Sequence, residues 1–262
     1  MARVLSIANQ KGGVGKTTSA ANLASCRALA GGRCLLIDMD PQSNATSGLG
    51  LDPRLGAGKV HPLLRAPRSG KVGRDRPGID GWVAPCRGTG LDVMAATPGL
   101  QEVERQIAAL PDGHERMTRL LDEVRGEYDE IILDCPPSLG LLTVNALYAS
   151  DGVIVPIQCE YFAMEGLSRI LDLIARVGRG RGREVSLAGV ILTMFDAAQD
   201  LCREVAGEVR RYFERTVFRT VVPRDVALAE APSHGLSIVE YAPRSRGAHA
   251  YVELAREAFA GG

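Results

Sequence analysis

The stretch "NQKGGVGKTTSAANLA" (9–24) follows a short apolar segment, 3–8, and leads into a segment of helical pattern, 17–30. A strand, a glycine-rich turn and a helix in this order are typical of a phosphate-binding loop. Three glycines let the backbone wrap closely and point its N–H groups inward: Gly12, Gly13 and Gly15. The start of the helix adds a positive dipole end, and we expect Lys16 to reach the β- and γ-phosphates of a nucleotide.

The loop departs from the strict pattern G-x-x-x-x-G-K-[ST], because Gln10 stands where the first glycine belongs. A second lysine, Lys11, stands beside the glycines instead. Val14 completes the candidate phosphate-binding residues, the Thr17 hydroxyl is the expected Mg²⁺ ligand, and Thr18 is placed at the α-phosphate.

Acidic residues follow two further apolar segments. In "IILDCPPS", four residues of strand pattern end at Asp134, which we expect to hold a water molecule bound to Mg²⁺. In "LLIDMDPQ", Asp38 and Asp40 end the second strand. Asp38 is compatible with a structural cap of the turn, whereas Asp40 lies just past the strand, where it can orient the water that attacks the γ-phosphate.

Short apolar runs alternate with helical patterns along the chain. The expected strands are 3–8, 33–38, 91–96, 130–134, 152–157 and 187–194, and the expected helices are 17–30, 98–110, 113–126, 163–178, 198–213 and 247–260. This alternation predicts an α/β fold with a mostly parallel twisted sheet and helices on both faces, like a P-loop NTPase. We expect one domain over 1–262, with an irregular excursion at about 52–90, and read "RVGRGRGRE" (176–184) as a basic loop.

Bulk composition excludes several classes of protein. The 31 basic and 31 acidic side chains cancel, so only a local patch can attract nucleic acid. No apolar run approaches the ~18 residues of a membrane-spanning helix, and the first residues do not resemble a leader peptide. Because the six cysteines are scattered without a C-x-x-C pair, we expect buried thiols in an intracellular protein.

Taken together, the motifs resemble one family over nearly the whole chain. "KGGVGKTT", "DMDPQSNATSGLG", "DCPPSLGLLTVNAL", "PIQCEYFAMEGLSRI", "GVILTMFD" and "VVPRDVALAEAPSHGLSIVEYAPRSRGAHAY" follow one another as in the ParA/Soj branch of the ParA/MinD ATPases, which carry a deviant Walker A motif. The 52–90 excursion is unlike the usual members.

The resemblance implies roles for individual residues. Lys11 corresponds to the signature lysine, which reaches across a two-fold interface to the nucleotide of the other subunit, so that ATP supports a homodimer. Asp40 corresponds to the catalytic residue that orients water, with Thr17 and Asp134 at the Mg²⁺ ion and the stretch after Asp134 as a switch. Adenine would lie against "VVPRD", at Pro223 and Asp225, although an asparagine is usual at the second position.

The resemblance also implies a cytoplasmic ATPase, associated with the nucleoid, that positions a plasmid, a chromosome origin or a protein assembly. In this branch a ParB-like partner stimulates hydrolysis and releases ATP-bound dimers from non-specific DNA. Two arginines expected to contact DNA are replaced here by Ala198 and Ala227. Other basic residues of the C-terminal third are candidates for compensation: Arg203, Arg210, Arg211, Arg215, Arg219, Arg224, Arg244 and Arg246.

Four alternatives stay open. A ParA-like ATPase can position a protein cargo on a scaffold without DNA. A MinD-like membrane ATPase needs a basic amphipathic tail, which "YVELAREAFAGG" does not resemble. An iron–sulfur ATPase needs converging cysteines, and Cys135 has no matching second one. An amide-forming synthetase with a similar loop is the fourth.

Overall fold

The computed structural model describes residues 1–56, 58–65, 79 and 81–260. Its centre is a seven-stranded sheet in the order β3-β4-β2-β5-β1-β6-β7. All neighbouring strands are parallel except β3 and β4, which are antiparallel. The strands are β1 (Arg3–Ile7), β2 (Cys34–Asp38), β3 (Val83–Pro85), β4 (Asp92–Met94), β5 (Glu130–Asp134), β6 (Gly152–Gln158) and β7 (Ser186–Thr193).

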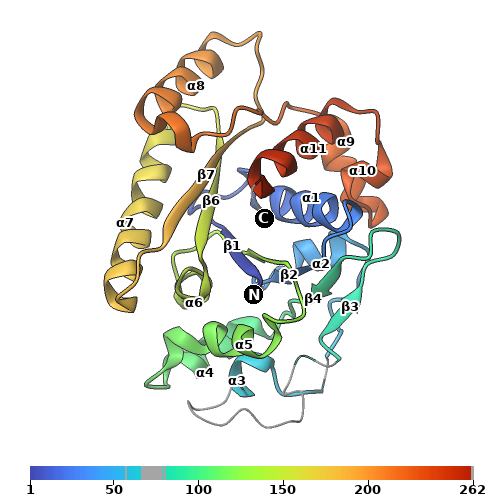
Figure 1. The fold of residues 1–262 in the computed structure, drawn as a ribbon, viewed down its shortest axis with the longest axis vertical. Coiled ribbons are helices and arrows are strands. Elements are labelled where there is room, and N and C mark those ends of the chain that lie inside the picture. The colour runs from blue at the N-terminus through green and yellow to red at the C-terminus, as the bar shows by residue number, and fades with distance from the viewer. Residues whose placement is uncertain (57, 66–78, 80, 261–262) are drawn as a thin grey trace.

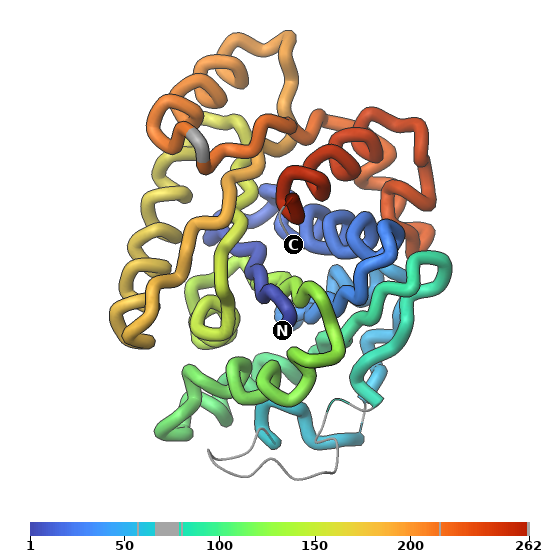
Figure 2. Tube along the Cα trace, viewed as in Figure 1, coloured from blue at the N-terminus to red at the C-terminus, as the bar shows by residue number. Residues whose placement is uncertain are grey.

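Helices cover both faces of this sheet (Figure 1). The helices are α1 (Lys16–Leu29), α2 (Asn44–Gly48), α3 (Pro62–Arg65), α4 (Leu100–Ala108), α5 (Arg116–Val124), α6 (Leu141–Ala149), α7 (Ala163–Arg181), α8 (Asp200–Phe213), α9 (Val226–Glu230), α10 (Ile238–Tyr241) and α11 (Arg246–Phe259). Helices α1 and α11 pack side by side on one face, and α4 to α8 cover the other. The tube in Figure 2 shows the N-terminal strand passing through the middle of the molecule, between these layers.

Alternation along the strands explains the two layers. On β1, Val4 packs into the core beneath α4 to α8, and Leu5 packs into the core beneath α1 and α11. The same alternation holds on β5, where Ile131 and Ile132 belong to opposite cores. Because both faces are covered, the strands read as continuous apolar runs, and the predicted α/β class is confirmed.

The short helices α2, α3, α9 and α10 were not expected, and the structure differs from the expected elements at three further places. Helix α6 was not expected, because "LLTVNALYA" is apolar nearly all round and is buried between the sheet and α5 and α7. The basic stretch 176–184 was wrongly predicted as a loop: α7 continues to Arg181, whose guanidinium donates to the Ser150 carbonyl, and ends at Gly182 with φ 66°. Strand β3 adds an antiparallel strand at the edge of the sheet, and its sequence has no alternating pattern that would predict a strand.

The excursion at 52–90 is partly built into the fold. Leu63 on α3 and Trp82 are both buried in the core, and the Arg116 guanidinium donates to the Leu63 carbonyl at 2.7 Å. Residues 57, 66–78 and 80 of this stretch lie outside the described residues. All six cysteines are free and buried, as expected.

Candidate functional site

The glycine-rich loop leaves the carboxyl end of β1, which lies between β5 and β6. Gly13 and Gly15 have φ angles of 74° and 85°, the left-handed region that favours glycine. Gly15 caps α1, which begins at Lys16. The loop is therefore placed where ligands bind in open α/β sheets.

Two residues that we did not predict hold this loop in place. The buried Thr193, at the end of β7, donates from Oγ1 to the Val14 carbonyl at 2.9 Å. The buried Asn9 donates from Nδ2 to the Pro156 carbonyl at 2.8 Å, which ties the start of the loop to β6. Such contacts join segments that are distant in sequence, so no local pattern could have identified Thr193.

A pocket of about 550 Å³ lies over the loop. Seven predicted site residues line it: Gly12, Gly13, Gly15, Lys16, Thr17, Thr18 and Asp40. Seven further residues complete the wall: Asn44, Ser47, Gly48, Pro137, Met194, Pro232 and Ser233. Lys11, Val14, Asp134, Pro223 and Asp225 do not line it.

Lys16 is almost enclosed, with only 7% of its surface exposed. Its ammonium donates to the Lys11 carbonyl at 3.0 Å. Burial lowers the pKa of Lys16, and the nearby Asp134, Cys135 and Asp40 oppose this shift. A buried cation beside an open pocket is suited to a phosphate ligand.

The register of the sheet brings two carboxylates side by side, because Asp134 on β5 pairs with Asp38 on β2. Asp38 is satisfied within the protein: Thr46 donates to its Oδ2 from the backbone N–H at 2.8 Å and from the hydroxyl at 2.7 Å. The Asp40 N–H donates to its Oδ1 at 3.0 Å. Burial raises the pKa of Asp38 to about 6 despite these hydrogen bonds. The structure thus gives Asp38 the role of a turn cap.

Asp134 has the opposite environment. It is completely buried, and neither carboxylate oxygen has a described hydrogen-bond partner of ordinary geometry. Burial and the charge of Asp38 raise its pKa well above the usual range, with the Thr17 hydroxyl close enough to offset part of the rise. A buried carboxylate without a partner, beside a threonine hydroxyl, fits a magnesium ion and its bound waters. In the described part of the chain, no group of three or more His, Cys, Asp or Glu residues forms a metal cluster, and Mg²⁺ held mainly by phosphate and water does not need one.

Asp40 lies at the pocket wall, with 6% of its surface exposed. Its Oδ1 accepts from the Gln42 N–H at 2.9 Å, and its carbonyl accepts from the Ser43 N–H at 2.8 Å. The turn therefore fixes the carboxylate at the edge of the space where a terminal phosphate would lie.

The side chain of Lys11 points away from the pocket of its own chain. Its ammonium forms an ion pair with Glu160 at 2.7 Å. It also lines a smaller hollow of about 270 Å³ with Gln10, Phe162, Glu165, Gly166 and Arg169. The two lysines of the loop thus face different spaces.

The predicted adenine contacts lie outside the pocket lining. The Asp225 carboxylate caps α9: Oδ1 accepts from the Ala227 N–H at 3.1 Å, and Oδ2 accepts from the Gly247 N–H at 2.8 Å. An asparagine has only one acceptor oxygen, so these two donors give a structural reason for aspartate here. Pro223 forms an isolated bridge with Phe195. Their contact with adenine stays a prediction.

Ala198 lies in the turn after Phe195 and Ala227 lies in the first turn of α9, and the bridge between Phe195 and Pro223 joins the two segments. Two exposed arginines lie at this region, Arg224 and Arg246, and a third exposed arginine, Arg244, is two residues before Arg246 in the chain. The Arg246 guanidinium donates to the Arg224 carbonyl at 3.4 Å, so residues from two segments meet here. None of the three forms an ion pair with a described residue, whereas Arg203 and Arg256 are paired.

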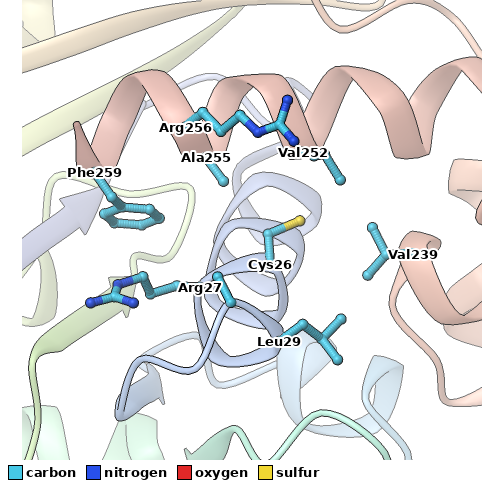
Figure 3. Close-up of a pocket in the computed structure, with 9 residues that line it drawn as sticks. Cys26, Arg27, Leu29, Val239, Val252, Ala255, Arg256 and Phe259 are labelled. Carbon is cyan, nitrogen blue, oxygen red and sulfur yellow. The ribbon is translucent and has the colours of Figure 1, made fainter.

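A separate pocket, of about 480 Å³, lies between α1, α10 and α11 (Figure 3). Its wall is mainly apolar, with Leu29, Val252 and Phe259 around it. The two arginines at its rim are already paired, Arg27 with Glu130 and Arg256 with Glu253. With no glycine-rich turn, it lacks the features of a phosphate site. Among the described helices, none combines the length and apolar character needed to cross a bilayer.

Comparisons with known proteins agree with this geometry. A family model described as AAA domain matches residues 2–186. The chain is 45% identical to the sporulation initiation inhibitor protein Soj of Bacillus subtilis over 262 residues, covering 100% of both chains. It is 44% identical to the chromosome partitioning protein ParA of Myxococcus xanthus over 97% of this chain and 87% of the relative. Among solved structures it is similar to cobyrinic acid a,c-diamide synthase from Mycobacterium smegmatis with bound ADP and magnesium, with a TM-score of 0.79 and 32% identity over 97% of this chain and 93% of that one.

Proposed function

Since the chain belongs to the ParA/Soj branch of the ParA/MinD family of P-loop ATPases, we propose that it partitions a chromosome or plasmid, or positions another cargo, through cycles of ATP hydrolysis. The protein is an ATP hydrolase that uses ATP with Mg²⁺. One observation carries the proposal. The phosphate loop, the buried Asp134 and Asp40 of the pocket wall come together at the carboxyl ends of the strands, in a chain 45% identical to Soj over its full length.

Each site residue then has a proposed role in phosphoryl transfer. The N–H groups from Gly12 to Thr18 cradle the phosphates, and Lys16 neutralises the β- and γ-phosphates. Thr17 would hold Mg²⁺ directly, and Asp134 would hold it through water; the ion when bound supplies charge neutralisation between the phosphates. Asp40 orients the water that attacks the γ-phosphorus, as the bond from that phosphorus to the oxygen of ADP breaks.

We assign Lys11 to the nucleotide of a second copy of the chain. Its side chain lines the small hollow with Phe162 and not the pocket that Lys16 lines; Phe162 is 61% exposed, and Tyr161, which is 78% exposed, packs edge-on against Phe162. An outward cation flanked by exposed aromatic rings is suited to an interface. In the homodimer, Lys11 would supply positive charge in trans where charge develops in the transition state.

We propose that the ATP-bound dimer binds DNA non-specifically and moves its cargo along the nucleoid in the cytoplasm. A ParB-like or other partner protein would stimulate ATP hydrolysis. Arg224, Arg244 and Arg246 support the DNA binding, because exposed arginines that form no ion pair with a described residue can neutralise DNA phosphates where Ala198 and Ala227 cannot; the charge of Asp196, which acts on Arg224 and Arg246, offsets part of this attraction. The same two alanines favour a second candidate, a ParA-like ATPase that moves a protein cargo on a scaffold without DNA. The similarity to the solved cobyrinic acid a,c-diamide synthase supports the alternative of an amide-forming synthetase. The chain is, however, less identical to this synthase (32%) than to Soj (45%).

DNA binding can be tested through its salt dependence. Arg224→Ala/Arg246→Ala should reduce the slope of log affinity against log salt by up to about 3.6, that is, four contacts per dimer at about 0.9 each. Arg256→Ala, which removes an arginine already paired with Glu253, serves as the matched control and should leave the slope unchanged. If the wild-type chain with ATP does not bind DNA at all, the scaffold alternative replaces this part of the proposal.

The dimer is tested with the two loop lysines. Lys16→Ala should abolish ATP binding, since the phosphates lose their buried cation. Lys11→Ala should keep ATP binding but lose both hydrolysis and the ATP-dependent dimer, measured by isothermal titration, phosphate release and sedimentation velocity. Normal dimerisation and hydrolysis by Lys11→Ala would contradict the role in trans.

A further inference from the structure

The Glu160 carboxylate, which pairs with Lys11, is held in position by hydrogen bonds of its own. Glu160 lies two residues after the end of β6, and its Oε1 accepts a hydrogen bond from the Gln158 side-chain amide. Its other oxygen, Oε2, receives the Lys11 ammonium at 2.7 Å. The Glu160 N–H also donates to the Gln158 carbonyl at 2.8 Å, so backbone and side chain both fix the carboxylate.

Lys11 is held toward β6 at its backbone as well. Its N–H donates to Asn9 Oδ1 at 3.1 Å, and Asn9 is itself bonded to the Pro156 carbonyl. Glu160 is the only acidic side chain that pairs with the Lys11 ammonium in the described part of the chain. In a single copy, therefore, the outward lysine of the loop is neutralised by its own chain.

A lysine that acts on a second copy's triphosphate must exchange one anionic partner for another. We propose that Glu160 is a positioning residue that restrains Lys11 in the unpaired chain, and that Lys11 leaves Glu160 when two copies pair around ATP. This inference rests on the proposed function, because it requires the dimer. Glu160 then sets the ATP and protein concentrations at which pairing occurs, and keeps the cation from binding other anions before the second copy arrives.

The size of the effect follows from exposure. The side chains of Lys11 and Glu160 are 33% and 47% exposed, so water and salt screen the pair. Two such pairs are broken per dimer. At the usual strength of exposed pairs, removing both should tighten the dimer by about 2- to 30-fold. The Glu160 carboxylate also repels incoming phosphates, and its removal acts in the same direction.

The test compares Glu160→Gln with wild type in Mg²⁺ and a non-hydrolysable ATP analogue, with the monomer–dimer dissociation constant measured by sedimentation velocity. Glutamine keeps the shape and the acceptor for Gln158 but removes the charge. Glu165→Gln is the matched control, because Glu165 lines the same small hollow and pairs with Arg169 rather than Lys11. Affinity for the analogue is measured separately in protein dilute enough to remain monomeric.

We expect Glu160→Gln to dimerise about 2- to 30-fold more tightly, with Glu165→Gln unchanged and monomer affinity for the analogue unchanged in both. An equal or weaker dimer of Glu160→Gln would overturn the inference, since Glu160 would then be indifferent to pairing or would contribute to the interface. A change in monomer affinity would overturn it too, since Glu160 would then act on its own chain's pocket. If wild type forms no ATP-dependent dimer, the proposed function fails instead.

Discussion

Replacing Asp134 by asparagine should stabilise the nucleotide-free chain while impairing its response to Mg²⁺. Asp134 is completely buried, neither of its oxygens has a hydrogen bond of ordinary geometry although the Thr17 hydroxyl lies close, and it is in register with Asp38. An amide of the same shape removes the buried charge and can donate to the neighbouring carboxylate. Leaving a buried polar group unsatisfied costs about 1–3 kcal/mol, so relief of that cost should raise Tm by about 2 to 12 °C in a chain of this size.

The magnesium response of Asp134→Asn should change in the opposite direction. Loss of a group that orients a metal's ligands usually weakens metal affinity about 10- to 100-fold, so Mg²⁺ should add less thermal stability in the presence of an ATP analogue. Differential scanning calorimetry, with and without Mg²⁺ and the analogue, measures both effects. The reasoning is refuted if the nucleotide-free variant unfolds at a lower temperature than wild type, or if its Mg²⁺ response is intact.

Asp129→Asn is the matched control. Asp129 precedes the same strand, but it is half-exposed and Arg33 donates to it from the guanidinium and from the backbone N–H. These hydrogen bonds hold the pKa of Asp129 at about 2. Its replacement should therefore lower stability, not raise it, and should leave the Mg²⁺ response unchanged.

Three further outcomes are expected. Asp40→Ala should bind ATP normally but hydrolyse it at least about 100-fold more slowly in a phosphate-release assay, and unimpaired turnover would remove Asp40 from the mechanism. Gly15→Ala should lower the unfolding free energy by about 1–2 kcal/mol in denaturant titration, because its φ of 85° strains any side chain, although a Cβ would meet Thr193 only at 3.7 Å. The stability of the nucleotide-free chain should fall as the pH rises from about 4 to 6. Asp38 has a pKa of about 6 in the folded state against 3.8 ordinarily, so the folded state binds more protons than the unfolded state over this range. Denaturant midpoints that rise over the same range would contradict this prediction.

The sequence predicted those parts of the molecule that depend on local patterns. The phosphate loop was recognisable because its glycines, lysine and threonines are consecutive, and six strands were recognisable as short apolar runs. Asp38 lies beside Asp134 because β2 and β5 are neighbours in the sheet, and local sequence patterns do not reveal the order of the strands. The orientation of Lys11 was expected only by resemblance, and its partner Glu160, about 150 residues away, was not anticipated at all.

Other failures have equally specific causes. Periodicity could not reveal α6, since nearly every side of that helix is buried. The stretch 176–184 was predicted as a basic loop, yet α7 continues to Arg181, where the guanidinium donates to the Ser150 carbonyl. The sequence also did not show that Asp225 is the N-cap that joins α9 to the start of α11, whereas its contact with adenine stays a prediction. Tertiary contacts decided each of these cases.

The two borders of the sheet limit how copies of this protein can associate. On one side β3 has only three residues and ends in Pro85, which offers no N–H to a further strand. On the other side the segment near Val217 and Pro223 bridges β7 and its extension, so the outer backbone of β7 is partly occupied. Neither border can readily template another molecule, so open-ended growth by strand addition is disfavoured and self-association is directed to side-chain surfaces.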